Sequence, residues 1–154
     1  MKDFEIQSVT VEIEVPAPFA WSVLLDYASY PLWNPYTVRV ESSCRVGDPV
    51  DLYLPDPARP GELLHQREFV VVNSPPRHFA YEMRPTAELA VGARRDQYIE
   101  ERGSGRCNYW TTDVFTGRYA EAAFAHSGTW VKQGFDAVAL ALKGRAEALF
   151  AALS

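Results

Sequence analysis

The chain has 154 residues, which suits a single domain, and its 47% hydrophobic and 23% charged residues are typical of a globular protein rather than a disordered one. Its formal net charge of −5 argues against a nucleic-acid partner, because binding a phosphate backbone requires a concentrated basic surface. We therefore predict one domain over residues 1–154 that does not bind nucleic acid.

The first part of the chain predicts one strand followed by two short helices. Residues 4–15 alternate apolar and polar side chains, as a strand with one buried face does, and Pro16 ends this pattern. Residues 17–27 predict a short helix with a proline in its first turn, where the missing N–H has little effect. The prolines at 31 and 35 predict that a second helix is broken.

The middle of the chain predicts six further strands. Turn-like segments rich in Gly, Pro, Asp and Asn separate them, and the short separators favour antiparallel hairpins. The expected ranges are 36–42, 48–54, 65–73, 77–84, 93–102 and 106–115.

The last third predicts one long amphipathic helix, from about residue 127 to residue 152. At 1.5 Å per residue it would be about 35 Å long. One stripe of it is apolar: Val131, Phe135, Val138, Leu142 and Leu149. The opposite side is polar: Lys132, Gln133, Asp136, Lys143 and Glu147. A sheet and a helix that each bury one face predict an α+β fold, with a curved sheet of about seven antiparallel strands around the helix and a cavity between them.

The loop 103–105 fixes a predicted strand register. An odd loop pairs Arg95 with Asp113 and sets two further matched pairs, Gln97 with Thr111 and Ile99 with Tyr109. An even loop would pair Arg95 with Thr112, which is a poorer match. We prefer the odd register, and we expect its aromatic and polar face to point inward. That face carries Arg95, Gln97, Tyr109, Thr111, Asp113 and Phe115, and the competing face carries Asn108, Trp110, Thr112 and Val114.

Arg95 and Asp113 have two interpretations. They form either a partly exposed ion pair of little energetic consequence, or a buried pair in which Arg95 holds a ligand oxygen and Asp113 orients the ligand or acts as a base. On the second interpretation Asp113, Arg95 and Tyr109 are the candidate catalytic residues.

Residue types that mark cofactor sites are sparse. Cys44 and Cys107 form no CxxC motif, and none of the three histidines has a second ligand at metal spacing. No phosphate-binding glycine loop occurs, so neither a metal nor a cofactor is expected. The charged N-terminal segment lacks the form of a signal peptide, and no stretch approaches the roughly 18 apolar residues of a membrane span. We expect a soluble, cytoplasmic protein without a transmembrane segment.

Two stretches resemble the START-like, or SRPBCC, superfamily: "VPAPFAWSVLLDYASYPLWNPY" near the start and "GFDAVALALKGRAE" near the end. This superfamily includes polyketide cyclases/aromatases, birch-pollen-allergen-like proteins and lipid-transfer domains. The resemblance implies a helix-grip fold, in which a seven-stranded sheet grips the C-terminal helix around a deep apolar pocket. It also implies that residues 33–36 lie beside the pocket mouth.

We therefore predict that the protein binds a hydrophobic, aromatic or polycyclic small molecule and acts as a carrier. The alternative is a cofactor-independent cyclase, aromatase or dehydratase that uses the same pocket, and a third hypothesis is a module that acts through protein contacts. The predicted ligand-binding residues are Trp33, Asn34, Tyr36, Phe69, Tyr81, Arg95, Gln97, Tyr109, Thr111, Asp113, Phe115, Trp130 and Phe135.

Overall fold

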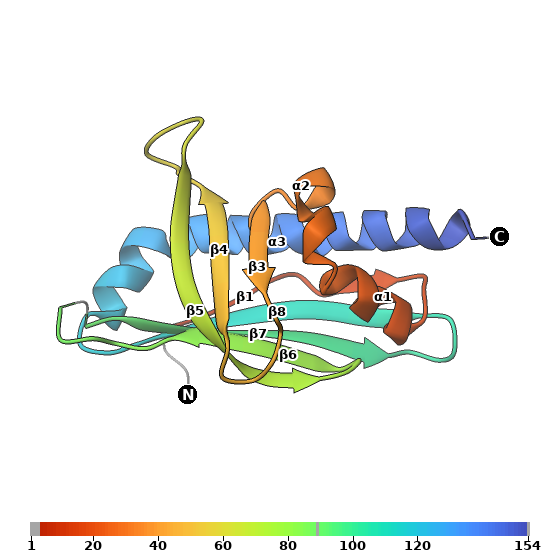
Figure 1. The fold of residues 1–154 in the computed structure, drawn as a ribbon, viewed down its shortest axis with the longest axis horizontal. Coiled ribbons are helices and arrows are strands. Elements are labelled where there is room, and N and C mark those ends of the chain that lie inside the picture. The colour runs from red at the N-terminus through yellow and green to blue at the C-terminus, as the bar shows by residue number, and fades with distance from the viewer. Residues whose placement is uncertain (1–3, 89, 154) are drawn as a thin grey trace.

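The strands of the protein form one antiparallel sheet that wraps around a long C-terminal helix, as a computed structural model shows for residues 4–88 and 90–153 (Figure 1). The sheet is eight-stranded, in the order β1-β8-β7-β6-β5-β4-β3, and β2 also pairs with β8. The elements in chain order are β1 Glu5–Gln7, β2 Val11–Ile13, α1 Ala17–Leu24, the 3-10 helix η1 Tyr27–Ser29, α2 Tyr30–Trp33, β3 Arg39–Ser42, β4 Pro49–Pro55, β5 Leu63–Ser74, β6 His78–Met83, β7 Gly92–Glu101, β8 Cys107–Thr116 and α3 Ala120–Ala151. The predicted α+β helix-grip fold is confirmed.

The sheet bends where β5 changes partners. The first half of β5 pairs with β4 and the second half with β6, and the register shifts between Val70 and Val72. Such a bulge bends a strand and increases its twist. As a result β3, β4 and the first half of β5 stand across α3, whereas β6, β7 and β8 run along it (Figure 1).

The first predicted strand is interrupted, which corrects the expectation of one strand over residues 4–15. The hydroxyl of Ser8 accepts from the Thr111 N–H at 3.0 Å, in place of a backbone carbonyl. The Ser8 N–H still donates to the Thr111 carbonyl at 2.9 Å, so β1 and β2 remain on the same neighbour, β8. The alternating pattern of the sequence continues through this break and therefore does not reveal it.

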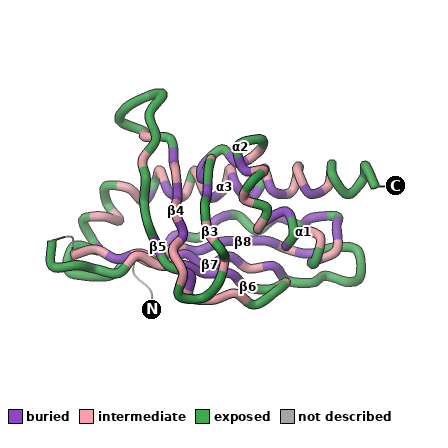
Figure 2. Tube along the Cα trace, in the orientation of Figure 1, coloured by how far each residue is buried: buried purple, intermediate pink, exposed green. Residues whose placement is uncertain are grey.

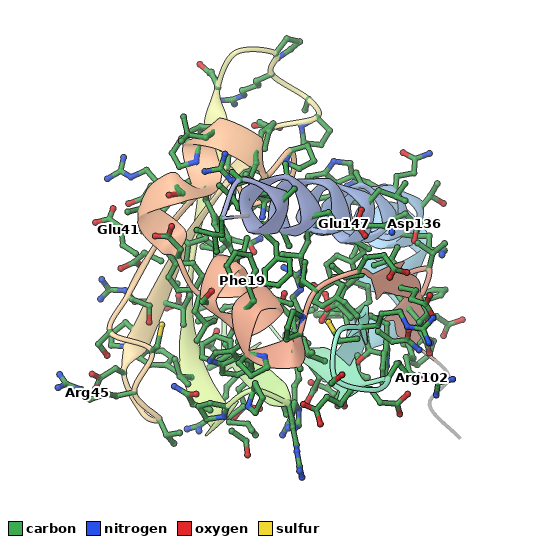
Figure 3. The ribbon with its side chains drawn as sticks, turned by 90° about the vertical axis from the view of Figure 1, so that its right-hand side faces the viewer. Phe19, Glu41, Arg45, Arg102, Asp136 and Glu147 are labelled. Carbon is green, nitrogen blue, oxygen red and sulfur yellow. The ribbon has the colours of Figure 1, made fainter. Side chains whose placement is uncertain are left out.

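Helix α3 satisfies the free backbone groups along this edge of the sheet. Asp136 Oδ1 accepts from the Val9 N–H at 2.7 Å, and Glu147 Oε2 accepts from the Glu14 N–H at 2.9 Å. Figure 3 labels both acidic residues on α3, above the β1–β2 segment. An unpaired strand edge invites pairing with another chain, and these side chains cover it.

Helix α3 is longer than predicted. It begins at Ala120, directly after the turn at Gly117, where the backbone φ of +93° favours glycine. Its 32 residues span about 48 Å. Four residues of the predicted stripe are buried, but Leu149 is 37% exposed, because the last turns of α3 lie largely in solvent (Figure 2). No helix of the described ranges is long and apolar enough to cross a membrane.

Removing the carboxylate of Asp136 should loosen this edge of the sheet. We expect Asp136→Ala to weaken it by about 1 kcal/mol, the net value of a typical hydrogen bond, and to speed exchange of the Val9 amide proton about fivefold. Hydrogen-exchange NMR measures this directly. Gln133→Ala, an exposed change on the same helix, is the control, and equal exchange rates in the two variants would contradict the role of Asp136.

Candidate functional site

The β7–β8 hairpin has the predicted odd register. Arg95 pairs with Asp113, Gln97 with Thr111 and Ile99 with Tyr109. The odd-numbered face points toward α3, and Tyr109 and Thr111 are completely buried on it. The two facing charges do not form an ion pair, however. The Arg95 side chain instead turns toward Thr111 and Tyr81.

Arg95 is a buried guanidinium held on three sides. Its Nε donates to Thr111 Oγ1 and its Nη1 donates to the Tyr81 hydroxyl, each at 3.0 Å. The guanidinium carbon lies 4.4 Å from the centre of the Phe135 ring, which α3 contributes. The third nitrogen, Nη2, is buried and has no hydrogen-bond partner among residues 4–88 and 90–153. An arginine stays protonated in proteins, so this nitrogen is an unused charged donor.

Two carboxyl groups lie close to Arg95, and each has a buried oxygen to which no described residue donates a hydrogen bond: Asp113 Oδ1 and Glu68 Oε1. Burial raises the pKa of Asp113 to about 7, although the nearby charge of Arg95 opposes this shift. Burial also raises the pKa of Glu68 to about 8, and the proximity of Asp113 adds to the effect. Both groups therefore hold protons to near neutral pH, unlike ordinary surface carboxylates.

Arg95, Asp113 and Glu68 surround one small cavity between the sheet and α3. Its volume is about 40 Å³. That is room for a few water molecules, whereas pockets for drug-sized ligands measure roughly 300 Å³ or more. The deep apolar pocket that the family resemblance implied is therefore closed in this conformation. The lining residues are Tyr36, Thr37, Leu52, Leu54, Gln66, Glu68, Tyr81, Arg95, Asp113 and Phe135.

Tyr36 and Thr37 form the part of the cavity wall that a loop contributes. Asn34 Oδ1 accepts from the backbone N–H groups of Tyr36 and Thr37, both at 3.0 Å, and this turn delays the start of β3 to Arg39. The Tyr36 ring lies directly on Gly134 of α3. A Cβ atom added at Gly134 would come within 2.3 Å of the ring, so only glycine permits this position.

The predicted site residues separate into three groups. Tyr36, Tyr81, Arg95, Asp113 and Phe135 line the cavity. A second group lies buried beside it: the Tyr109 hydroxyl donates to Gln97 Oε1 at 2.7 Å, and Thr111 supports Arg95. The third group packs elsewhere: Trp33 on Tyr30, Phe115 on Phe124, and Trp130 on the side of Tyr36, while Asn34 shapes the loop.

Phe69 is a correction, because it lies on the outer face of the sheet and is 40% exposed. Alternation along β5 instead turns Glu68 and Val70 inward. Sequence reasoning missed Glu68, as well as the cavity-lining residues Thr37, Leu52, Leu54 and Gln66. The available signal was the period of two itself, which places Glu68 and Phe69 on opposite faces of the strand.

The two raised pKa values predict an unusual pH dependence of stability. Unfolded carboxyl groups ionise near pH 4, whereas Asp113 and Glu68 keep their protons to about pH 7 and about pH 8 in the folded state. Between these limits the folded state therefore binds more protons than the unfolded state. The free energy of unfolding falls as the pH rises through this range. The slope is at most about 1.4 kcal/mol per pH unit for each group.

Urea unfolding at pH 5 and pH 8 measures this slope. The double variant Glu68→Gln/Asp113→Asn should flatten it, whereas Glu100→Gln, which changes an exposed acid paired with Arg102, should leave it unchanged. Carboxylates with lowered pKa, such as Asp96 and Glu147, lose their contribution only at lower pH and do not mask the effect. An unaltered slope in the double variant would show that the two groups ionise normally.

No family model and no curated protein matches the sequence, but many solved structures resemble the fold. The ZhuI aromatase/cyclase from Streptomyces sp. R1128 has a TM-score of 0.73 and 23% identity, over 93% of each chain. A START superfamily protein from Mycobacterium smegmatis has a TM-score of 0.67 and 16% identity, over 94% of this chain and 98% of that one. A norcoclaurine synthase point mutant from Thalictrum flavum has a TM-score of 0.64 and 14% identity, over 92% of each chain. At such identities the likeness concerns architecture rather than activity, and it establishes that this chain has the START-like, or SRPBCC, helix-grip fold.

Proposed function

We propose that the protein binds a hydrophobic small molecule in an opened form of the cavity between the sheet and α3, and that the polar end of the ligand meets Arg95. The observation that carries this proposal is the convergence of three buried polar atoms without partners, on Arg95, Glu68 and Asp113, around one cavity. Buried polar groups in folded proteins are nearly always hydrogen-bonded. Three exceptions in one place support a site that a ligand completes.

The remaining walls suit an apolar, aromatic ligand body. Leu52 and Leu54 contribute aliphatic surface from β4, and Tyr36 and Phe135 contribute aromatic rings. Binding pockets commonly combine such walls with a few convergent polar groups that orient the ligand. The tyrosines add hydrogen-bonding capacity at the rim of the aromatic surface.

Ligand entry requires Tyr36 to move, since the closed cavity is too small for an aromatic ring. Tyr36 and Thr37 belong to the loop between α2 and β3, whereas the other walls are parts of strands β4 to β8 or of α3. Loops rearrange more readily than such elements. Outward rotation of the Tyr36 ring from Gly134 would join the cavity to the surface near the exposed residue Gln66.

A cyclase, aromatase or dehydratase is the second candidate function. It is supported by the fold likeness to an aromatase/cyclase and by carboxyl groups whose pKa values, about 7 and about 8, are close to the optimum for proton transfer at neutral pH. An ionised Asp113 would take a proton from the carbon between two carbonyl groups. The electron pair would move to a carbonyl oxygen, and Arg95 would stabilise the resulting enolate.

The binding proposal is tested with 2-acetonaphthone, a neutral aromatic ketone, by isothermal titration calorimetry. We expect saturable binding that Arg95→Met weakens, because the ketone oxygen loses its charged donor. Gly134→Ala should displace the Tyr36 ring and favour the open form, and a shift of about 1 kcal/mol would tighten apparent binding about fivefold. Gly144→Ala is the matched control, since nothing lies within 4 Å of its added Cβ.

Circular dichroism checks that each variant folds. Gly144→Ala should raise stability by up to about 1 kcal/mol through helix propensity alone and leave binding unchanged. Absence of saturable binding of both this ketone and its anionic analogue 2-naphthoate, in the native protein and in Gly134→Ala, would refute the binding proposal.

Catalysis has a separate readout. The enzyme should speed solvent deuterium incorporation at the central carbon of a naphthyl 1,3-diketone, and Asp113→Asn should abolish that increase. A protein that binds the diketone without accelerating exchange is a carrier and not an enzyme of this class.

A further inference from the structure

The charge balance of the cavity is unusual. Arg95 supplies one fixed positive charge, while Glu68 and Asp113 are neutral when protonated and negative when ionised. The tyrosines Tyr36, Tyr81 and Tyr109 face Arg95 from neighbouring elements. Two further acids act on the carboxyl groups through their charge: Glu82 raises the pKa of Glu68, and Asp96 raises the pKa of Asp113. Among the cavity-lining residues, α3 contributes Phe135 and β4 contributes Leu52 and Leu54, so neither element adds a charge.

We propose that the ligand carries an oxyanion head, a carboxylate or an enolate, which binds Arg95 while Glu68 and Asp113 are protonated and is released when they ionise. This inference rests on the proposed binding function and assigns both the chemistry of the ligand and the control of its release. It follows from three side chains that line one cavity and that each carry a buried polar atom without a partner among the described residues.

In the protonated state all three side chains are donors. Arg95 Nη2 offers an N–H, and each protonated carboxyl group offers one O–H, so three donors line the cavity. Charge-assisted hydrogen bonds of this kind are roughly twice as strong as neutral ones. A carboxylate has enough lone pairs to accept all three, and its charge neutralises that of Arg95.

Ionisation reverses both the charge and the hydrogen-bonding character of the site. With both carboxyl groups protonated the site carries +1, from Arg95 alone. With both ionised it carries −1, because two negative charges are added to one positive charge. The carboxylates then accept hydrogen bonds from Arg95 themselves, and they repel an anionic ligand in surroundings with little screening.

The pKa values of the empty cavity, about 7 for Asp113 and about 8 for Glu68, set the pH range of this change. The tyrosines do not take part. Burial raises the pKa of Tyr81 to about 12, and it also raises the pKa of Tyr36 and Tyr109. By linkage, a bound anion raises the carboxyl pKa values further, so binding takes up protons from the solution.

The experiment compares two probes of similar shape at pH 6 and pH 9: 2-naphthoate, which is anionic throughout, and 2-acetonaphthone, which is neutral. Calorimetry should show naphthoate affinity falling by at least about tenfold between these pH values, because one or more protons must be bound. The ketone affinity should change much less. Titration of naphthoate near pH 8 in two buffers of different ionisation enthalpy should also reveal proton uptake.

The double variant Glu68→Gln/Asp113→Asn should restore naphthoate binding at high pH. Its amides keep N–H donors and cannot ionise, so it should bind naphthoate at pH 9 about as well as the native protein does at pH 6. Glu100→Gln, an exposed acid of β7, should retain the native pH dependence. Each single variant should remove part of the effect.

The outcomes separate the two proposals. Binding of both probes with a pH dependence that the double variant does not change would overturn the anion-release mechanism and leave the binding function intact. Binding of the ketone alone at every pH would overturn the oxyanion assignment. Failure of both probes in every variant would overturn the binding function and this inference with it.

Discussion

The burial of one guanidinium sets the constraints for the rest of this site. Arg95 lies under the Phe135 ring with 5% of its surface exposed, in a position where an unpaired charge is costly. Tyr81 and Thr111 satisfy two of its nitrogens without neutralising it. Hydroxyl dipoles and the face of an aromatic ring therefore stabilise the positive charge of Arg95. One nitrogen of the guanidinium remains for another partner.

The nearby carboxyl groups could have neutralised that charge, and their geometry shows why they do not. Asp113 is paired with Arg95 across the strands, but the guanidinium points toward Tyr81 on β6 and away from an ion pair. The Val114 N–H donates to the Asp113 carboxyl, and desolvation outweighs both this bond and the charge of Arg95. The site thus combines a guanidinium that no ion pair neutralises with two carboxyl groups that burial keeps protonated to near neutral pH.

Sequence reasoning succeeded where two independent constraints agreed. In the β7–β8 hairpin the loop parity and the matched side-chain pairs point to the same register, and the structure has it. In α3 the apolar stripe from Val131 to Leu142 has one period over several turns, and it is buried as predicted. When two patterns over many residues predict the same arrangement, few other registers or facings are compatible with the sequence.

Sequence reasoning failed where a side chain or a bulge broke the periodicity of a strand. Ser8 replaces a backbone acceptor with its hydroxyl and interrupts the first strand without disturbing the alternating sequence. The bulge after Val70 shifts the register of β5 against β6, and Phe69, which was expected in the cavity, lies on the exposed face instead. The closure of the cavity depends on Gly134, whose role is visible only when the Tyr36 ring is seen against it. That closure also constrains the ligand. A small anion would satisfy Arg95 but would not replace the apolar contacts that Tyr36 loses on opening, while a hydrocarbon would replace those contacts and leave three buried polar atoms unmet. A molecule with a flat apolar body and one oxygen-bearing end meets both requirements, which is why the polar cluster and the aromatic wall belong to one site.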